Sequence, residues 1–90
     1  MHELAICEGI LDVVLEVAGD RSVRRVAVAI GPQWAVSRES FDQSFQVAAQ
    51  DTPAAGALIE QEEADGGTLL IKEIELEGGV VLTNPEPPSA

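Results

Sequence analysis

The stretch VRRVAVAI, residues 23–30, decides the fold of this 90-residue chain. Val26 and Val28 alternate with the small residues Ala27 and Ala29, so both faces of a strand at this point can be covered. A Gly-Pro pair follows directly and ends the segment. The stretch is therefore predicted to be a strand that other elements cover.

Helical patterns lie on both sides of this strand. Before it, apolar residues recur at three- and four-residue spacing and predict a helix that ends at Gly19-Asp20; they are Leu4, Ile6, Cys7, Ile10, Leu11, Val14, Leu15 and Ala18. After it, residues 38–50 fit a second helix, with Ser37 as the N-cap and Phe41 and Phe45 on the buried face. Cys7 is expected to serve as a small core hydrophobe, since it lies within the first stripe.

Two acidic segments come after the second helix. Residues 57–63 and 68–77 are predicted to be strands, and the tight-turn signal Asp65-Gly66-Gly67 between them favours a hairpin. In the later segment the apolar residues change parity halfway, and a β-bulge near Lys72-Glu73 would return them to one face. We expect the glutamates of both segments to form a solvated face that protects the sheet edges from aggregation.

The predicted order of elements is α-β-α-β-β. It describes a two-layer α/β (α+β) sandwich, with two helices on one face of a small three-stranded mixed sheet. These elements fill residues 1–79, which are expected to form one domain. Residues 80–90 are expected to add a short edge strand and a proline-rich, disordered tail.

The charge of the chain limits its partners. Sixteen acidic and five basic residues give a formal net charge of −11, which argues against binding to nucleic acid or to an anionic membrane. Cation handling, a basic protein partner and simple solubility all remain open. The chain has one cysteine, no signal segment and no apolar stretch of the roughly 20 residues that span a bilayer, so a cytoplasmic location is the default.

The sequence offers no catalytic constellation. With one histidine, one cysteine and no tyrosine, nucleophile and base pairs are few, and none lies in a recognisable elbow or phosphate-binding loop. The chain is therefore not expected to be an enzyme. Trp34 could either cover the core or anchor a partner. Arg21, Arg24 and Arg25 could dock an acidic partner or simply be solvated.

The first three residues, Met1-His2-Glu3, are the candidate metal site. The terminal α-amine, the amide nitrogen of His2 and its imidazole Nδ1 can close fused five- and six-membered rings around one ion. The amide nitrogen of Glu3 can supply a fourth nitrogen in the same plane. Such a square-planar, all-nitrogen set suits Ni(II) or Cu(II).

The residues that carry a family resemblance run in order along most of the chain. They are Met1-His2-Glu3-Leu4, Ile6-Cys7, Ile30-Gly31, residues 52–58 (TPAAGAL) and residues 70–76 (LIKEIEL). Over roughly residues 1–77 the chain resembles the nickel-binding domain of the HypA family, the metallochaperones of nickel-iron hydrogenase maturation. The resemblance implies Ni(II) bound by the His2 imidazole and by backbone nitrogens of His2 and Glu3, with the Met1 amine as a further donor.

The chain departs from the family at one place. The family carries a zinc module with paired Cys-x-x-Cys motifs between its second and third strands, whereas residues 63–67 here pass directly from strand to strand. No structural zinc is expected. The resemblance implies a hydrogenase large subunit or a maturation GTPase as protein partner, and the chain is expected to be a monomer or a small homo-oligomer. The alternative is a metal-free module that binds a hydrogenase subunit or maturation factor.

Overall fold

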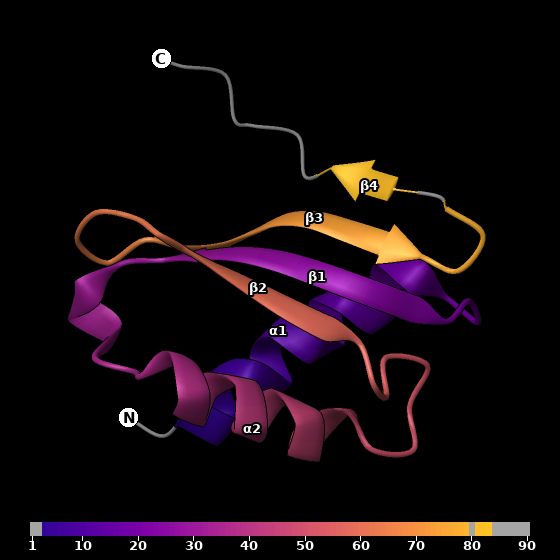
Figure 1. Cartoon of the computed structure of the whole chain (residues 1–90), viewed down its shortest axis with the longest axis horizontal. Coiled ribbons are helices and arrows are strands. Elements are labelled where there is room, and N and C mark those ends of the chain that lie inside the picture. The colour runs from indigo at the N-terminus through magenta and orange to yellow at the C-terminus, as the bar shows by residue number, and fades with distance from the viewer. Residues whose placement is uncertain (1–2, 80, 84–90) are drawn as a thin grey trace.

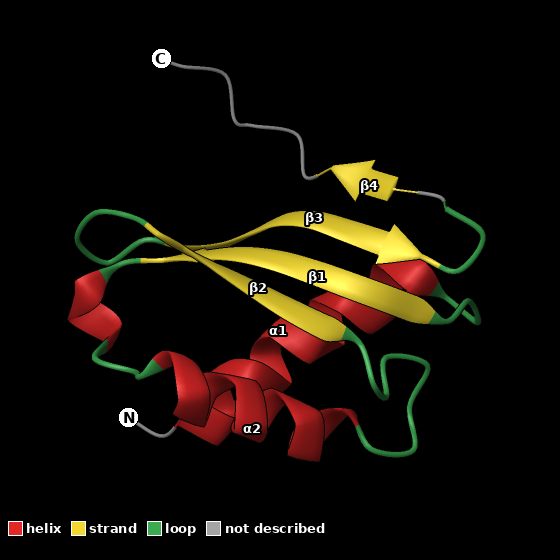
Figure 2. Cartoon of the chain, viewed as in Figure 1, coloured by secondary structure: helices red, strands yellow, loops and turns green. Residues whose placement is uncertain are grey.

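The computed structural model describes residues 3–79 and 81–83, which fold into two layers (Figure 1). The elements follow the order α1 (Glu3–Ala18), β1 (Val23–Ile30), the 3-10 turn η1 (Pro32–Trp34), α2 (Arg38–Ala49), β2 (Leu58–Glu63), β3 (Leu69–Leu76) and β4 (Val81–Thr83). Both helices lie against the same face of a mixed sheet (Figure 2). The predicted fold class is confirmed. The short edge strand expected after residue 79 is β4, which makes the sheet four-stranded, and the predicted tail, residues 84–90, lies outside the described residues.

The order of strands across the sheet is β2-β1-β3-β4. Strand β1 pairs in parallel with β2 and antiparallel with β3, so it separates the two. The predicted hairpin is therefore wrong: the turn at Asp65-Gly66-Gly67 connects strands that are not neighbours. The reason is that β1 is the strand with apolar or small residues on both faces, which favours a central position over the acidic β2.

The predicted β-bulge is confirmed at Lys72. Ala27 pairs with Glu73 and Val28 pairs with Ile71, which leaves Lys72 as the extra residue on β3. The inserted residue resets the alternation of side chains. The apolar residues on both sides of it consequently face the core: Ile74 and Leu76 are buried, while Leu69 and Ile71 pack against the buried cluster.

The residues predicted to begin α2 and to end α1 do so in the structure. The Ser37 side chain accepts a hydrogen bond from the backbone N–H of Ser40 at 3.1 Å and caps α2. Gly19, at a φ of 64°, takes the left-handed conformation that ends α1. Helix α2 ends at Ala49, one residue before the predicted end.

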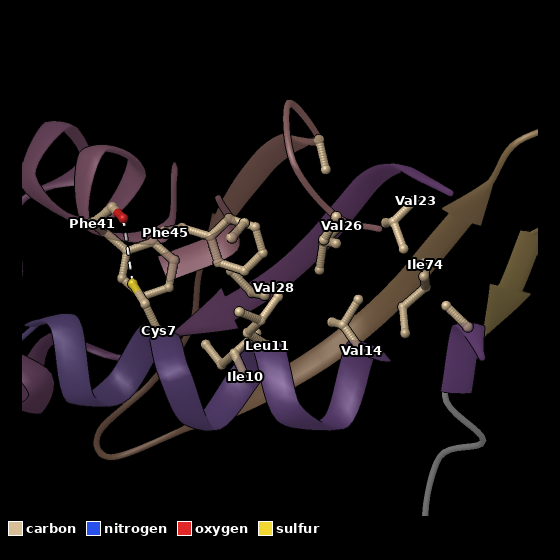
Figure 3. Close-up of a cluster of buried hydrophobic side chains, with 14 of the residues drawn as sticks. Cys7, Ile10, Leu11, Val14, Val23, Val26, Val28, Phe41, Phe45 and Ile74 are labelled. Carbon is tan, nitrogen blue, oxygen red and sulfur yellow. Dashed lines mark hydrogen bonds between the residues drawn. The ribbon is translucent and has the colours of Figure 1, made fainter. Parts of the chain in front are cut away.

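The core lies between the helices and the sheet (Figure 3). Phe41 and Phe45 of α2 and Val14 of α1 are fully buried and meet Val26 and Val28 of β1. No described helix is both long and apolar enough to cross a membrane.

Candidate functional site

The predicted metal site lies at the start of α1. Met1 and His2 are outside the described residues, and Glu3 is the first residue of the helix. Nothing in the described structure tests these three residues as ligands. Within residues 3–79 and 81–83, no group of three or more His, Cys, Asp or Glu side chains is placed to hold a metal ion.

The first turns of α1 are firmly docked. Ile6 is 7% exposed and Cys7 is fully buried, which confirms the core role of Cys7. Its Sγ lies 3.4 Å from the carbonyl oxygen of Phe41, so α1 meets α2 near the first turns of both helices (Figure 3). The beginning of α1 is therefore held at a defined place against α2.

The face of the sheet opposite the helices carries an ion-pair cluster centred on Arg25. This guanidinium donates to Glu60 of β2 at 2.7 Å and to Glu75 of β3 at 3.0 Å, and it also pairs with Glu73. Lys72 pairs with Glu62 at 3.0 Å. The acidic strands thus form an ordered network around one arginine.

The carboxylates of the cluster favour the charged form of Arg25. The hydrogen bonds that Arg25 donates to Glu75, then to Glu73 and Glu60, raise the pKa of Arg25 above its ordinary value. The stability that a raised pKa gives to a cation is lost only as pH rises through that pKa. Arginine is protonated at neutral pH with or without such partners. The sequence indicated the basic segment but not this role, because the three carboxylates come from two strands distant in the chain.

Replacing Arg25 with glutamine is expected to lower the midpoint of thermal unfolding by a few degrees. The three carboxylates would then repel one another without a central cation. Because salt screens repulsion between exposed charges, the deficit should shrink when unfolding is repeated at about 1 M salt. Arg24→Gln is the matched control, since Arg24 is exposed and next in sequence. An equal loss in both variants would contradict the assigned role of Arg25.

Trp34 covers the end of the core. It is half-buried and packs against the buried cluster, and its Nε1 donates to the carbonyl oxygen of Gly67 at 2.9 Å. Of the two predicted roles, the structure supports the structural one. A backbone hydrogen bond joins the same two segments, η1 and the turn after β2: the N–H of Gln33 donates to the carbonyl oxygen of Gly66 at 3.0 Å.

A cavity that the sequence did not predict lies at the carboxyl ends of β1 and β2. It measures about 390 Å³ and is bounded by Ile30, Pro32, Val36, Arg38, Gln61 and Glu63 together with their neighbours. In α/β sheets, ligands bind outside the carboxyl ends of parallel strands. No motif marks this cavity, since β1, η1 and β2 each contribute only part of its lining.

Comparisons with known proteins show which proteins the chain is similar to. A family model described as hydrogenase/urease nickel incorporation metallochaperone, hypA, matches residues 1–77. Hydrogenase maturation factor HypA of Crocosphaera subtropica is 39% identical over 66 residues, which is 73% of this chain and 58% of that protein. HypA 2 of Bradyrhizobium diazoefficiens is 39% identical over 69 residues, 73% of this chain and 61% of that protein. The chain spans less than two thirds of these relatives.

A solved structure has the same fold. The solution structure of the nickel metallochaperone HypA from Helicobacter pylori superimposes with a TM-score of 0.59 over 96% of this chain and 73% of that one. The sequence identity is 18%, so this likeness concerns the arrangement of helices and strands.

Proposed function

The chain belongs to the HypA family of hydrogenase/urease nickel-incorporation metallochaperones, and from that membership we propose that it binds Ni(II) at its N-terminus and passes the ion to a nickel enzyme. We propose a nickel-iron hydrogenase as the recipient. The family consists of metallochaperones and not of enzymes, in agreement with the sequence prediction. The observation that carries the proposal is that the family match begins at residue 1 and so includes Met1-His2-Glu3.

The proposed ligands are the His2 imidazole, the backbone nitrogens of His2 and Glu3, and the Met1 amine. Glu3 begins α1, and the first N–H groups of a helix have no acceptor within it. Loss of the Glu3 amide proton to a metal would therefore break no helical hydrogen bond. The helix dipole opposes a cation at this end, but each amide that loses its proton supplies a compensating negative charge.

Support for delivery comes from the docked beginning of α1. The buried Ile6 and Cys7 hold the first turns of α1 against the core and α2, so the start of the helix has a defined position. An incoming ligand from a partner could displace the nitrogens one at a time. We propose a hydrogenase large subunit or a maturation GTPase as that partner, in the cytoplasm. The absence of structural zinc stays a prediction.

Nickel titration of the untagged chain tests the site. We expect one Ni(II) per chain with a square-planar absorption spectrum, and at least about 100-fold weaker binding by His2→Ala, because the imidazole closes the chelate. Affinity should fall as pH is lowered, because protons compete for the imidazole, the amine and the amide nitrogens.

The control is a chain with extra residues before Met1, which removes the terminal amine and keeps every side chain. It should also bind weakly. If the three proteins bind alike, or if none binds, the N-terminal site is wrong. Absence of nickel binding together with co-purification of a hydrogenase component would favour the alternative, a metal-free module that binds a hydrogenase subunit or maturation factor.

A further inference from the structure

Strand β2 forms one edge of the sheet and, among the described strands, pairs only with β1 (Figure 2). The backbone N–H of Ala64 donates to the carbonyl oxygen of Ile30 at 3.1 Å. The even-numbered residues of this segment therefore direct their backbone N–H and C=O groups toward β1. Successive residues of a strand direct their backbone groups to opposite sides. Ile59, Gln61 and Glu63 therefore direct their N–H and C=O groups to the outer edge, where a further strand could pair with them.

The cavity of about 390 Å³ lies at the carboxyl end of this edge. Ile30, Pro32 and Val36 give it an apolar wall, and Gln61 and Glu63 of β2 form part of its rim. Two residues that direct backbone groups outward thus also border the cavity. A strand that paired with β2 would reach the cavity mouth, and the apolar wall fits one bulky apolar side chain.

The charge of β2 decides between possible occupants. Its sequence, LIEQEE, holds three carboxylates and no base, within a chain of net charge −11. Glu60 and Glu62 pair with Arg25 and Lys72, whereas no ion pair of Glu63 is found among the described residues. A second copy pairing at this edge would bring the same glutamates together, and like charges on adjacent strands destabilise a sheet. A basic segment would instead be attracted to the edge. Arg38 is the one cation among the described residues that line the cavity, where Glu62 and Glu63 outnumber it.

We propose that the outer edge of β2 and the adjoining cavity bind an extended, basic segment of a partner protein. The segment adds to the sheet as a fifth strand, next to β2, and places one apolar side chain in the cavity. One of its lysine or arginine side chains lies beside Glu63, the β2 glutamate that borders the cavity. The proposed surface does not include Met1, His2 or a metal. The docking proposal therefore goes beyond the proposed nickel site and is tested independently of it.

The probe is an acetylated six-residue peptide of alternating lysine and valine that ends in leucine, titrated into the full 90-residue chain without metal. We expect saturable binding, and amide hydrogen exchange at Ile59, Gln61 and Glu63 slowed by about tenfold or more at saturation, since these amides gain acceptors. A peptide with the same side chains but methylated backbone nitrogens should lose this protection. A peptide with glutamate in place of lysine should not bind.

Two charge-reversal variants separate the edge from the overall field of the protein. Glu63→Lys should weaken binding of the lysine peptide by about fivefold to tenfold, because the reversed charge lies at the cavity rim. Glu77→Lys makes the same change at an exposed position at the far end of β3, and it should have little effect. Equal weakening by both variants, or equal binding of the methylated peptide, would overturn the proposal and indicate attraction by net charge alone.

Discussion

Replacing Phe45 with alanine is expected to lower the free energy of unfolding by about 3–5 kcal/mol. Phe45 is fully buried in the middle of the core, and with Phe41 it is among the largest side chains that have no exposed surface (Figure 3). The chain has only three aromatic residues, and apart from Phe41 the buried side chains around the ring are smaller than it. The variant would lose burial and keep a cavity.

That loss is large for a domain of this size. At about 0.05–0.15 kcal/mol per residue, 90 residues have a total stability of roughly 5–13 kcal/mol. Urea unfolding followed by the fluorescence of Trp34 measures the change, because this single tryptophan packs against the core. Val47→Ala, on the same helix and 57% exposed, should change stability by less than about 0.5 kcal/mol. A Phe45 variant as stable as this control would show that the core was assigned wrongly.

Replacing Gly31 with alanine is expected to lower the free energy of unfolding by about 2–3 kcal/mol, because there is no room for a Cβ atom at this position. The φ and ψ of Gly31 are −85° and 161°, an extended conformation open to any residue. A Cβ at this position, however, would lie 2.7 Å from the carbonyl oxygen of Asp65 and still closer to that of Gly66. Both obstacles are backbone atoms, so relief requires the turn after β2 to move away. The hydrogen bonds that Gly31 and Gln33 make with the turn segment would then lengthen.

Gly9→Ala is the matched control for this substitution. Gly9 lies on the exposed face of α1, and a Cβ there would meet nothing within 4 Å. Because alanine is the better helix former, this variant should be more stable than the parent by up to about 1 kcal/mol. Thermal unfolding of the two variants should therefore shift in opposite directions. A Gly31→Ala protein that unfolds at the parent temperature would contradict the close approach of the two loops.

Much of the fold could be predicted from the sequence because its signals are local. The apolar stripe of α1, the Ser37 cap and the bulge at Lys72 each depend on residues a few positions apart, and all three are present in the structure. The candidate nickel site is likewise a local pattern, since all its ligands come from Met1-His2-Glu3. It stays a prediction, because Met1 and His2 are outside the described residues.

By itself, the sequence determined which segments are helices and strands, which side of each is buried and which family the chain resembles. The tertiary structure alone decided that β1 separates β2 from β3, that three glutamates from two strands meet at Arg25 and that Gly31 has no room for a side chain. The physical reason is the distance along the chain over which each kind of interaction acts. Periodicity and capping act within one or two turns of chain, whereas strand order and close approach depend on burial and pairing summed over segments far apart in sequence.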